Sequence, residues 1–551
     1  MIKKAIRKSY PILFVTLLFA LTGAVLQLRA LYITKDLVDN ALSMDRSIDF
    51  LKANAVKMVI WSAFSIFFVL VGNFFQSLYY RKAVEYAKTF YLKTIFKKKI
   101  NEFQAENTAK YFSNLTNDME RIENEYIMSL YEILYMIFQA GISVGVLLYV
   151  NYVILLAGLA VGLIFAVMAA LMGIPMQKHQ KQLSDILGKY TEYVKEILSA
   201  FQIIKTNNLQ KKASDDFYHK SKNVEDKEFF VGKLSSYILL ILISILLLLV
   251  LGIILGGIYL VYLKLITVGT LMFALSPMTR IVNSFGNVGG YIQAIVGLKK
   301  VFKTIDDNLK NADIYEEIIE LSSFNSLIEF KNVSFSYGEN EVLKNVSLKF
   351  EKGKKYLIVG PSGGGKTTVL KLLRKYFNPS GGEILVDGKN LKDITPLSYF
   401  ENIANIEQQV FLFEDSLYNN ITLYKNYSQD EIKEAIKNAG LTSFVENLPG
   451  CLDYKITDNG KNISGGEKAR IAIARGLITR ADLIFLDEAF ASLDMETAIR
   501  IEQTLLALKN VTVINVSHVV FDKTKEQYDN IITVKNKGID IKTSLKTLLD
   551  F

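Results

Sequence analysis

The sequence predicts two unlike domains in one chain, an all-α domain of six membrane-spanning helices followed by an α/β domain. Six apolar runs of spanning length occur within residues 1–310. After Leu327 the pattern changes to short apolar strands that alternate with helical segments. A glycine-rich loop at residues 360–368 lies between one of these strands and a helix, as phosphate-binding loops do.

Composition supports a membrane protein. At 551 residues the chain is too long for one ordinary domain, and its hydrophobic fraction of 50% is high for a soluble protein. The 64 basic and 55 acidic residues give a net charge of +9, but the basic residues cluster beside apolar runs. This distribution fits the positive-inside rule better than nucleic-acid binding. Cys451 is the only cysteine, which excludes an intramolecular disulfide and a multi-cysteine zinc site.

The N-terminal segment resembles a signal peptide, because basic residues within positions 1–10 precede a long apolar run. No clear small-residue cleavage site follows, and the run continues to about Ile33. We therefore expect an uncleaved first span. Five further spans are expected at residues 58–80, 126–150, 153–172, 236–260 and 265–296.

Two long connections between spans, residues 81–125 and 177–233, are highly charged and helical in pattern. Both contain clustered lysines, so the positive-inside rule places both in the cytoplasm. The outer connections carry no basic excess. We therefore expect a multi-pass protein of the cell membrane with both termini and the α/β domain on the cytoplasmic side.

Arg280 lies inside the sixth apolar run, shortly after Pro277. A charge within the membrane is costly and usually faces the bundle interior or a wet cavity, so Arg280 is a candidate for the substrate pathway. The alternative is a structural pair with a backbone carbonyl or with an acid on a neighbouring helix, with Pro277 marking a kink.

The domain boundary follows from a change to charged and polar residues at 299–325. We expect a membrane domain at 1–310, a linker at 311–326 and an α/β nucleotide-binding domain at 327–551. Strands are expected at residues 328–335, 344–350, 356–359, 383–386, 483–486 and 511–515.

The loop at residues 360–368 has the chemistry of a phosphate cradle. Its glycines let backbone N–H groups turn toward an anion, Lys366 supplies a positive charge, and Thr367 offers a hydroxyl to Mg²⁺. A generic glycine-rich turn would not require this spacing. The expected contacts to a nucleoside triphosphate are Gly360, Ser362, Gly363, Gly365, Lys366, Thr367 and Thr368.

A second element of the same site is the apolar strand 483–486 followed by Asp487 and Glu488. Acidic strand ends are common at protein surfaces, but after a phosphate loop in one domain this pair indicates an NTPase. We expect Asp487 to hold Mg²⁺ and Glu488 to polarise the attacking water.

Ser464, Gly465, Gly466 and Glu467 begin a helical pattern that could be an ordinary capped helix. Together with the two preceding motifs they resemble the signature of ATP-binding cassette (ABC) transporters, with Glu467 where glutamine is common. The resemblance implies binding of ATP with Mg²⁺, and contact of this helix start with the nucleotide.

The same resemblance assigns roles to four further residues. It implies that Tyr337 stacks on adenine, although a strand-end tyrosine is the alternative reading. It implies that Gln408, which has Gln409 as its neighbour, senses Mg²⁺ and contacts the membrane domain. Asp494 would reach across a dimer, and His518, the only histidine of the domain, would contact the γ-phosphate.

The membrane half resembles the exporter-type half-transporters of this family at residues 114–122, 196–205 and 267–271. At 457–460 the sequence departs from the family pattern Gly-Glu-x-Gly, because only Gly460 matches. The departure concerns the loop that communicates with the cytoplasmic connections of the membrane domain.

The resemblance implies an ATP-hydrolysing transporter that exports a hydrophobic or amphipathic substrate, such as a lipid, drug or peptide. A homodimer in the lipid bilayer is the first expectation, and a heterodimer with a second half-transporter is the alternative. Two other functions use the same motifs: an importer built on the exporter fold, and a membrane ATPase that regulates a partner without transport.

Overall fold

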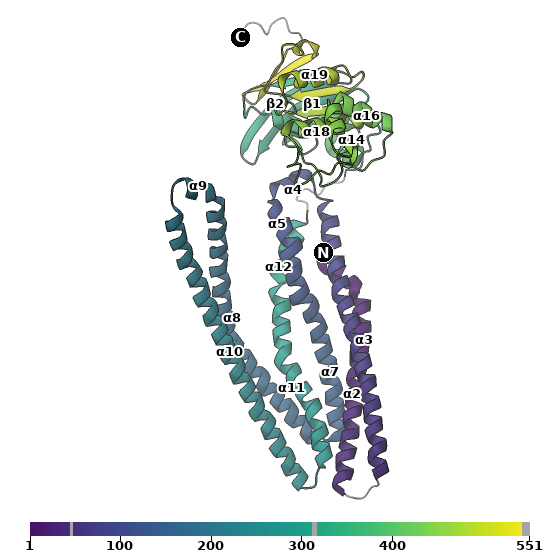
Figure 1. Cartoon of the computed structure of the whole chain (residues 1–551), viewed down its shortest axis with the longest axis vertical. Helices are drawn as coiled ribbons and strands as arrows, with labels where there is room; N and C mark the ends of the chain where they lie inside the picture. Colours follow the sequence, from purple (N-terminus) through teal and green to yellow (C-terminus); the bar gives the residue numbers. More distant parts are fainter. Residues whose placement is uncertain (44–47, 311–316, 543–551) are drawn as a thin grey trace. The chain divides into compact units, whose positions relative to one another are not determined.

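Residues 1–43, 48–310 and 317–542 are described by a computed structural model of the chain (Figure 1). The chain divides into two compact units, Met1–Lys98 with Glu106–Lys310, and Lys99–Ala105 with Asn311–Phe551. The short helix α4 (Ile100–Ala105) therefore belongs to the second unit, although its sequence lies among the long helices. The first residues of the predicted linker, 311–316, and the last of the predicted α/β domain, 543–551, lie outside the described residues.

In the helical unit five predicted spans lie within helical stretches, and the sixth, 265–296, begins three residues before its helix. Among the described residues, five helical stretches are long and apolar enough to cross a membrane: Ile2–Leu42, Ile48–Ile95, Thr108–Val150, Tyr152–Ser199 and Gln210–Tyr262. The sixth predicted span is α11 (Val268–Gly297), which is not in this set but packs against α2, α7 and α8. The predicted all-α transmembrane domain is confirmed. Its helices are α1 (Ile2–Ile6), α2 (Tyr10–Ser43), α3 (Ile48–Ile95), α5 (Thr108–Ser113), α6 (Met119–Arg121), α7 (Met128–Val150), α8 (Tyr152–Ser199), α9 (Phe201–Thr206), α10 (Gln210–Tyr262), α11 and α12 (Lys299–Asn308).

The helices are longer than the apolar runs that predict them. Helix α3 has 48 residues, and at about 1.5 Å per residue it is roughly 70 Å long, more than twice the hydrocarbon thickness of a bilayer. Hydropathy marks only the apolar part of such a helix, because the backbone remains helical in the charged segments beyond it. Helices α8 and α10 have 48 and 53 residues, and Figure 1 shows that they form a hairpin closed by α9.

The end of α2 fixes the start of α11. Asp39 accepts hydrogen bonds from the Gly269 backbone N–H at 2.8 Å and from the Thr267 hydroxyl at 2.6 Å. A side chain at Gly269 would place its Cβ 2.3 Å from the Lys35 carbonyl oxygen, so only glycine allows this approach. These contacts align α11, which carries Arg280, with α2.

The second unit is built on two sheets. One is antiparallel, in the order β2-β1-β4-β5, and the other has the order β10-β9-β3-β8-β7-β6. In the second sheet all pairs are parallel except β9 with β10. The strands are β1 (Leu327–Tyr337), β2 (Asn340–Glu351), β3 (Lys355–Val359), β4 (Gly381–Val386), β5 (Lys389–Asn390), β6 (Ile403–Ile406), β7 (Leu483–Asp487), β8 (Thr512–Val516), β9 (Asn530–Lys535) and β10 (Gly538–Lys542).

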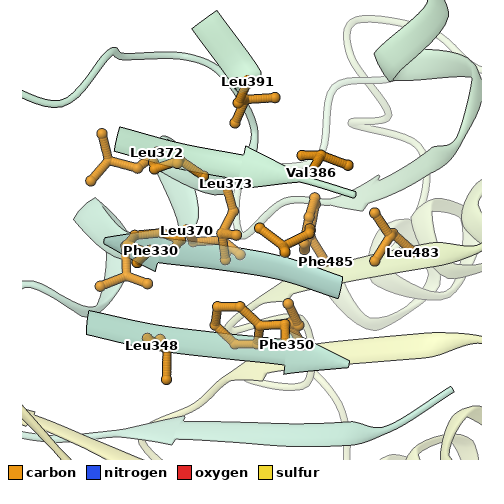
Figure 2. Close-up of a cluster of buried hydrophobic side chains, with 14 of the residues drawn as sticks. Phe330, Leu348, Phe350, Leu370, Leu372, Leu373, Val386, Leu391, Leu483 and Phe485 are labelled. Carbon is orange, nitrogen blue, oxygen red and sulfur yellow. The ribbon is translucent and has the colours of Figure 1, made fainter. Parts of the chain in front are cut away.

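One hydrophobic core joins the two sheets and the helix that follows the glycine-rich loop. Figure 2 shows Phe330 and Phe350 of the antiparallel sheet gathered with Leu370 of α13 and Phe485 of β7, and all four are buried. The glycine-rich loop is therefore held between a buried strand and a buried helix, as expected for a P-loop α/β domain. The helices of this unit, besides α4, are α13 (Lys366–Leu373), α14 (Pro396–Glu401), α15 (Leu417–Thr422), α16 (Gln429–Asn438), α17 (Thr442–Asn447), α18 (Gly465–Ile478) and α19 (Met495–Leu506).

Candidate ATP site

The glycine-rich loop connects β3 to α13 through backbone conformations that favour glycine. Gly360, Gly363 and Gly365 have φ angles of 148°, 77° and 105°. A Cβ on Gly360 would lie 2.2 Å from the Val534 carbonyl oxygen, so this glycine is required by space as well as by conformation. The loop thus forms a backbone cradle of the type that binds phosphate at a helix start.

Lys366 is the first residue of α13 and is only 4% exposed. Its ammonium group donates hydrogen bonds to the carbonyl oxygens of Gly360 at 2.9 Å and Pro361 at 3.0 Å. Burial lowers the pKa of Lys366, while the carboxylates of Glu488 and Asp487 oppose that change. The positive charge is therefore held inside the loop, where a phosphate oxygen could replace its carbonyl partners.

The two predicted carboxylates lie where β7 ends. Asp487 is 8% exposed, and burial raises its pKa, which the nearby Arg374 guanidinium opposes. Glu488 has a φ of 50°, a left-handed conformation that a non-glycine residue seldom adopts. Its N–H donates to the Val516 carbonyl oxygen at 2.9 Å, which fixes this turn against β8. Such strain is common at functional sites.

Glu488 is the point at which three predicted residues meet. The Gln408 side-chain amide donates to Glu488 Oε2 at 2.7 Å, and His518 Nε2 lies 2.9 Å from Glu488 Oε1. The three side chains follow β6, β7 and β8, whose carboxyl ends share one edge of the parallel sheet. The geometry places Gln408 in this cluster and gives no such contact to Gln409.

Sequence reasoning missed a second layer of polar residues below this cluster. Arg374, which is 2% exposed at the end of α13, lies 3.6 Å from Asp487 and 4.0 Å from Glu407, and it donates to the Ile406 carbonyl oxygen at 3.2 Å. The Tyr376 hydroxyl donates to Glu407 at 2.7 Å. Arg374 has basic neighbours at Lys371 and Lys375, so no signal in the sequence singles it out.

The residues present suit Mg²⁺ only in combination with a nucleotide. Asp487, Thr367 and Gln408 offer a carboxylate, a hydroxyl and an amide, which are oxygen ligands that a hard cation accepts. Within the described ranges no group of three or more His, Cys, Asp or Glu residues could hold a metal by itself. This agrees with the usual binding of Mg²⁺ through one or two protein groups plus substrate phosphates.

Tyr337 ends β1 and is 39% exposed. Its ring makes edge contacts with Phe335 and Phe377, at centroid distances of 4.8 Å and 5.4 Å, and the Lys371 ammonium lies 5.8 Å from its centroid. Tyr337 is thus a partly exposed aromatic residue at the end of a strand, and its stacking on adenine stays a prediction.

The signature residues form a capping box at the start of α18. The Ser464 side chain accepts from the Glu467 N–H at 3.3 Å, and Glu467 Oε2 accepts from the Ser464 N–H at 2.6 Å. Gly466 lies against the segment before Asp494, since its Cβ would be 3.2 Å from the Ser492 carbonyl oxygen. In the part of the chain that is described, the hydrogen bonds of Ser464 stay within this helix start and do not reach Lys366 or Glu488.

Asp494 is the N-cap of α19 and accepts from the Thr497 N–H at 2.9 Å. This hydrogen bond is the main reason that its pKa is lowered. The carboxylate therefore has a structural partner in its own chain, and the predicted reach across a dimer is a separate role that this contact does not test.

The atypical loop at 457–460 is bonded to the segment after Gln408. The Asn459 side chain accepts from the Leu412 N–H at 2.8 Å. Gly460 has a φ of 77° and leaves little room, because its Cβ would lie 2.9 Å from Leu412. The loop therefore keeps a direct link to the glutamine-containing segment despite its unusual sequence.

In the helical unit, Arg280 NH2 donates to the Gln27 amide oxygen at 2.7 Å. The NH1 group is buried, and among the described residues it has no hydrogen-bond partner. Neither an acid nor a backbone carbonyl pairs with this guanidinium in the described structure, in contrast to the structural alternative that the sequence allowed.

Comparisons with known proteins agree with the family resemblance of the sequence. The ABC transporter transmembrane region matches residues 12–285, and the ABC transporter family matches residues 343–491. The chain is 30% identical to the ATP-dependent lipid A-core flippase of Haemophilus influenzae strain 86-028NP over 82% of this chain and 78% of the relative. An uncharacterized ABC transporter ATP-binding protein of Bacillus subtilis, YfiC, is 28% identical over 79% of this chain and 72% of its own.

A solved structure of a bacterial Atm1-family ABC exporter with ATP bound has the same fold. It aligns with a TM-score of 0.80 over 97% of this chain and 95% of the other, at 21% identity. The membrane bundle, the glycine-rich loop and the fused α/β unit thus agree with the family matches and the curated relatives. The chain belongs to the ABC transporter family, as an exporter-type half-transporter whose ATPase is coupled to transport across a membrane.

Proposed function

We propose that two half-transporters assemble to export an amphipathic substrate, with Glu488 as the residue that activates water for ATP hydrolysis. The observation that carries this proposal is the cluster of Glu488, Gln408 and His518 beside the P-loop, fused to a membrane bundle. The curated relatives include lipid A-core flippases, which favours a lipid-like substrate.

Each residue of the cluster has a chemical task in this proposal. The loop N–H groups and Lys366 bind the phosphates, and Thr367 and Asp487 are the ligands for Mg²⁺, with Gln408 as a further contact. Mg²⁺, when bound, neutralises charge on the phosphates. Glu488 orients the attacking water, and His518 stabilises charge at the γ-phosphate while keeping Glu488 in place.

We infer a dimer because the candidate ATP site of one chain is incomplete. Ser464, Gly465 and Gly466 present backbone N–H groups at the start of α18, but their bonds do not reach the phosphate loop of their own chain. A second chain would bring this helix start to the nucleotide. A homodimer is favoured because both halves of the composite site are intact in this sequence, and a heterodimer is the alternative.

The orientation of the chain is also part of the proposal. The lysines of the segments 81–125 and 177–233 favour the cytoplasm for both, and the α/β domain and both termini would lie on the same side. ATP is then hydrolysed in the cytoplasm. Arg280, with its unpartnered NH1, is the candidate contact for an anionic group of the substrate.

Transport into inside-out vesicles tests the proposal. A fluorescent phospholipid added outside should be moved to the inner leaflet only with ATP, and Glu488→Gln should abolish this movement. Glu496→Gln, an exposed residue of α19, is the matched control and should transport normally. ATP-driven movement in the opposite direction would show an importer. Substrate-independent ATPase activity without any movement would favour the regulatory alternative.

A further inference from the structure

A polar pocket lies among the membrane-spanning helices α2, α3 and α7. It has a volume of about 220 Å³. Most of its lining is polar or aromatic, although it lies within stretches long and apolar enough to cross a membrane. The lining residues are Ala20, Val69, Asn73, Gln76, Tyr131, Glu132 and Tyr135.

Glu132 is the only charged residue in this lining. In the described part of the chain it has neither an ion pair nor a hydrogen bond. The nearby cation Arg280 is bonded to Gln27. An unpaired carboxylate within a membrane is costly, and such a group marks a binding site or an ion pathway more often than a structural contact.

Two tyrosines, Tyr131 and Tyr135, line the same pocket as this carboxylate. The rings of Tyr131 and Tyr135 are stacked, with centroids 5.8 Å apart, and Tyr80 meets Tyr131 edge-on at 6.2 Å. A carboxylate among aromatic rings is the chemistry that recognises an organic cation, through charge pairing and cation–π attraction.

Amide side chains hold the aromatic rings in position. Gln76 donates to the Tyr80 hydroxyl at 2.7 Å, and Gln139 donates to the Tyr135 hydroxyl at 3.0 Å. Each glutamine lies one helical turn from its tyrosine on the same helix. Because the Tyr135 hydroxyl accepts one of these bonds, its own proton stays available for an acceptor in the pocket.

We propose that Glu132, with Tyr131 and Tyr135, forms a subsite for the cationic amine group of an amphipathic substrate. This inference rests on the proposed export function, since it names a chemical feature of the substrate. The pocket volume admits a small ammonium head group, and an alkyl chain attached to it would extend along the apolar helices. Arg280 remains the candidate contact for an anionic group of the same substrate.

Equilibrium dialysis of the full chain in nanodiscs tests the subsite with decyltrimethylammonium as the probe, after subtraction of binding to empty nanodiscs. Glu132→Gln should weaken binding about tenfold, and Glu132→Asp should retain most of it. Binding of decanesulfonate, which has the same chain and the opposite charge, should not change. Glu125→Gln is the matched control, because Glu125 pairs with Arg121 outside the pocket.

The aromatic part is tested separately. Tyr135→Phe should keep the binding of decyltrimethylammonium, whereas Tyr135→Leu should weaken it, because only the second change removes the ring face. Basal ATPase activity and thermal stability of each variant report whether it folds. If Glu132→Gln does not fold, the binding of decyltrimethylammonium by Glu132→Asp, Tyr135→Phe and Tyr135→Leu tests the subsite instead.

The outcomes separate this inference from the proposed function. Equal binding of the cation by wild type and a folded Glu132→Gln variant would overturn the subsite, even where vesicle transport of phospholipid succeeds. Loss of cation binding in Glu132→Gln without any ATP-driven transport by the wild type would instead support the subsite and contradict the export function.

Discussion

At the scale of single residues, the ATP site depends on buried polar groups that hold the exposed ones. Arg374 is buried beside Asp487, and Glu488 is held from two sides by Gln408 and His518. A buried charge that loses its partner is more damaging than a lost surface pair. The second layer should therefore be as sensitive to substitution as the residues that meet ATP.

Arg374→Leu is expected to lower the free energy of unfolding by about 3 kcal/mol, because it leaves Asp487 buried without its cation. Burial already raises the pKa of Asp487, and the loss of Arg374 would raise it further. Since Mg²⁺ needs the ionised form, the acidic limb of the ATPase pH profile should move to higher pH. An unchanged profile in a folded variant would contradict this positioning role.

Glu502 gives a second prediction at this scale. It is 3% exposed on α19, accepts hydrogen bonds from Thr524 and from Tyr528, the latter at 2.6 Å, and has a pKa raised by burial. A raised folded-state pKa means that the folded protein binds the proton more tightly. The stabilising contribution is full below the ordinary glutamate pKa and is lost as pH rises through the folded value.

Glu502→Gln should therefore flatten the pH dependence of thermal stability relative to the wild type, between the ordinary glutamate pKa and neutral pH. Melting temperatures of the full-length protein over this range measure the difference between the two. Parallel curves for both proteins would show that Glu502 does not titrate in this way.

At the scale of elements, the phosphate loop is constrained by the strand beside it. Gly360 packs against the backbone of β9, and the loop continues into α13, whose Leu370 lies in the core between the sheets (Figure 2). The loop shape is thus imposed from both ends. This explains why an element without regular structure can present its N–H groups in a fixed arrangement.

Gly360→Ala should reduce ATP affinity at least about tenfold, because the new Cβ would lie 2.2 Å from the Val534 carbonyl oxygen and would displace the loop. Gly388→Ala is the matched control. Gly388 also has a positive φ, of 80°, but no atom lies within 4 Å of the position that a Cβ would take there. It should cost about 1 kcal/mol of stability without loss of ATP binding. Similar ATP affinities for both variants would contradict the packing argument.

The elements that could be predicted from the sequence are those that have a recognisable residue pattern of their own. The phosphate loop, the strand before Asp487 and the capped helix at Ser464 each carry their own residue pattern, and each lies where it was expected. Strands β5, β6, β9 and β10 were not predicted. Strand β5 has two residues and β6 four, β6 and β9 depend on parallel neighbours distant in the chain, and within the described residues β10 pairs only with β9. The contact of Arg374 with Asp487 was unpredictable for the same reason, since 113 positions separate the two residues.

At the scale of the whole molecule, the proposed dimer places the two halves of each ATP site on different chains. Co-reconstitution of two inactive variants tests the homodimer. Lys366→Met removes the phosphate contact and Ser464→Arg blocks the signature helix start. Mixed together, they should recover up to about a quarter of the wild-type ATPase activity, because only mixed dimers retain one intact composite site. Activity no greater than that of either variant alone would contradict a homodimer in which one intact site is sufficient.

The most direct test of the central claim is ATP binding and steady-state hydrolysis by Glu488→Gln in the full-length protein. Glu488 should be needed for the chemical step and not for binding, so this variant should bind ATP with wild-type affinity while its kcat falls at least about a hundredfold. Glu496→Gln should match the wild type in both measurements. Wild-type turnover by Glu488→Gln would contradict the assignment of Glu488 as the residue that activates water.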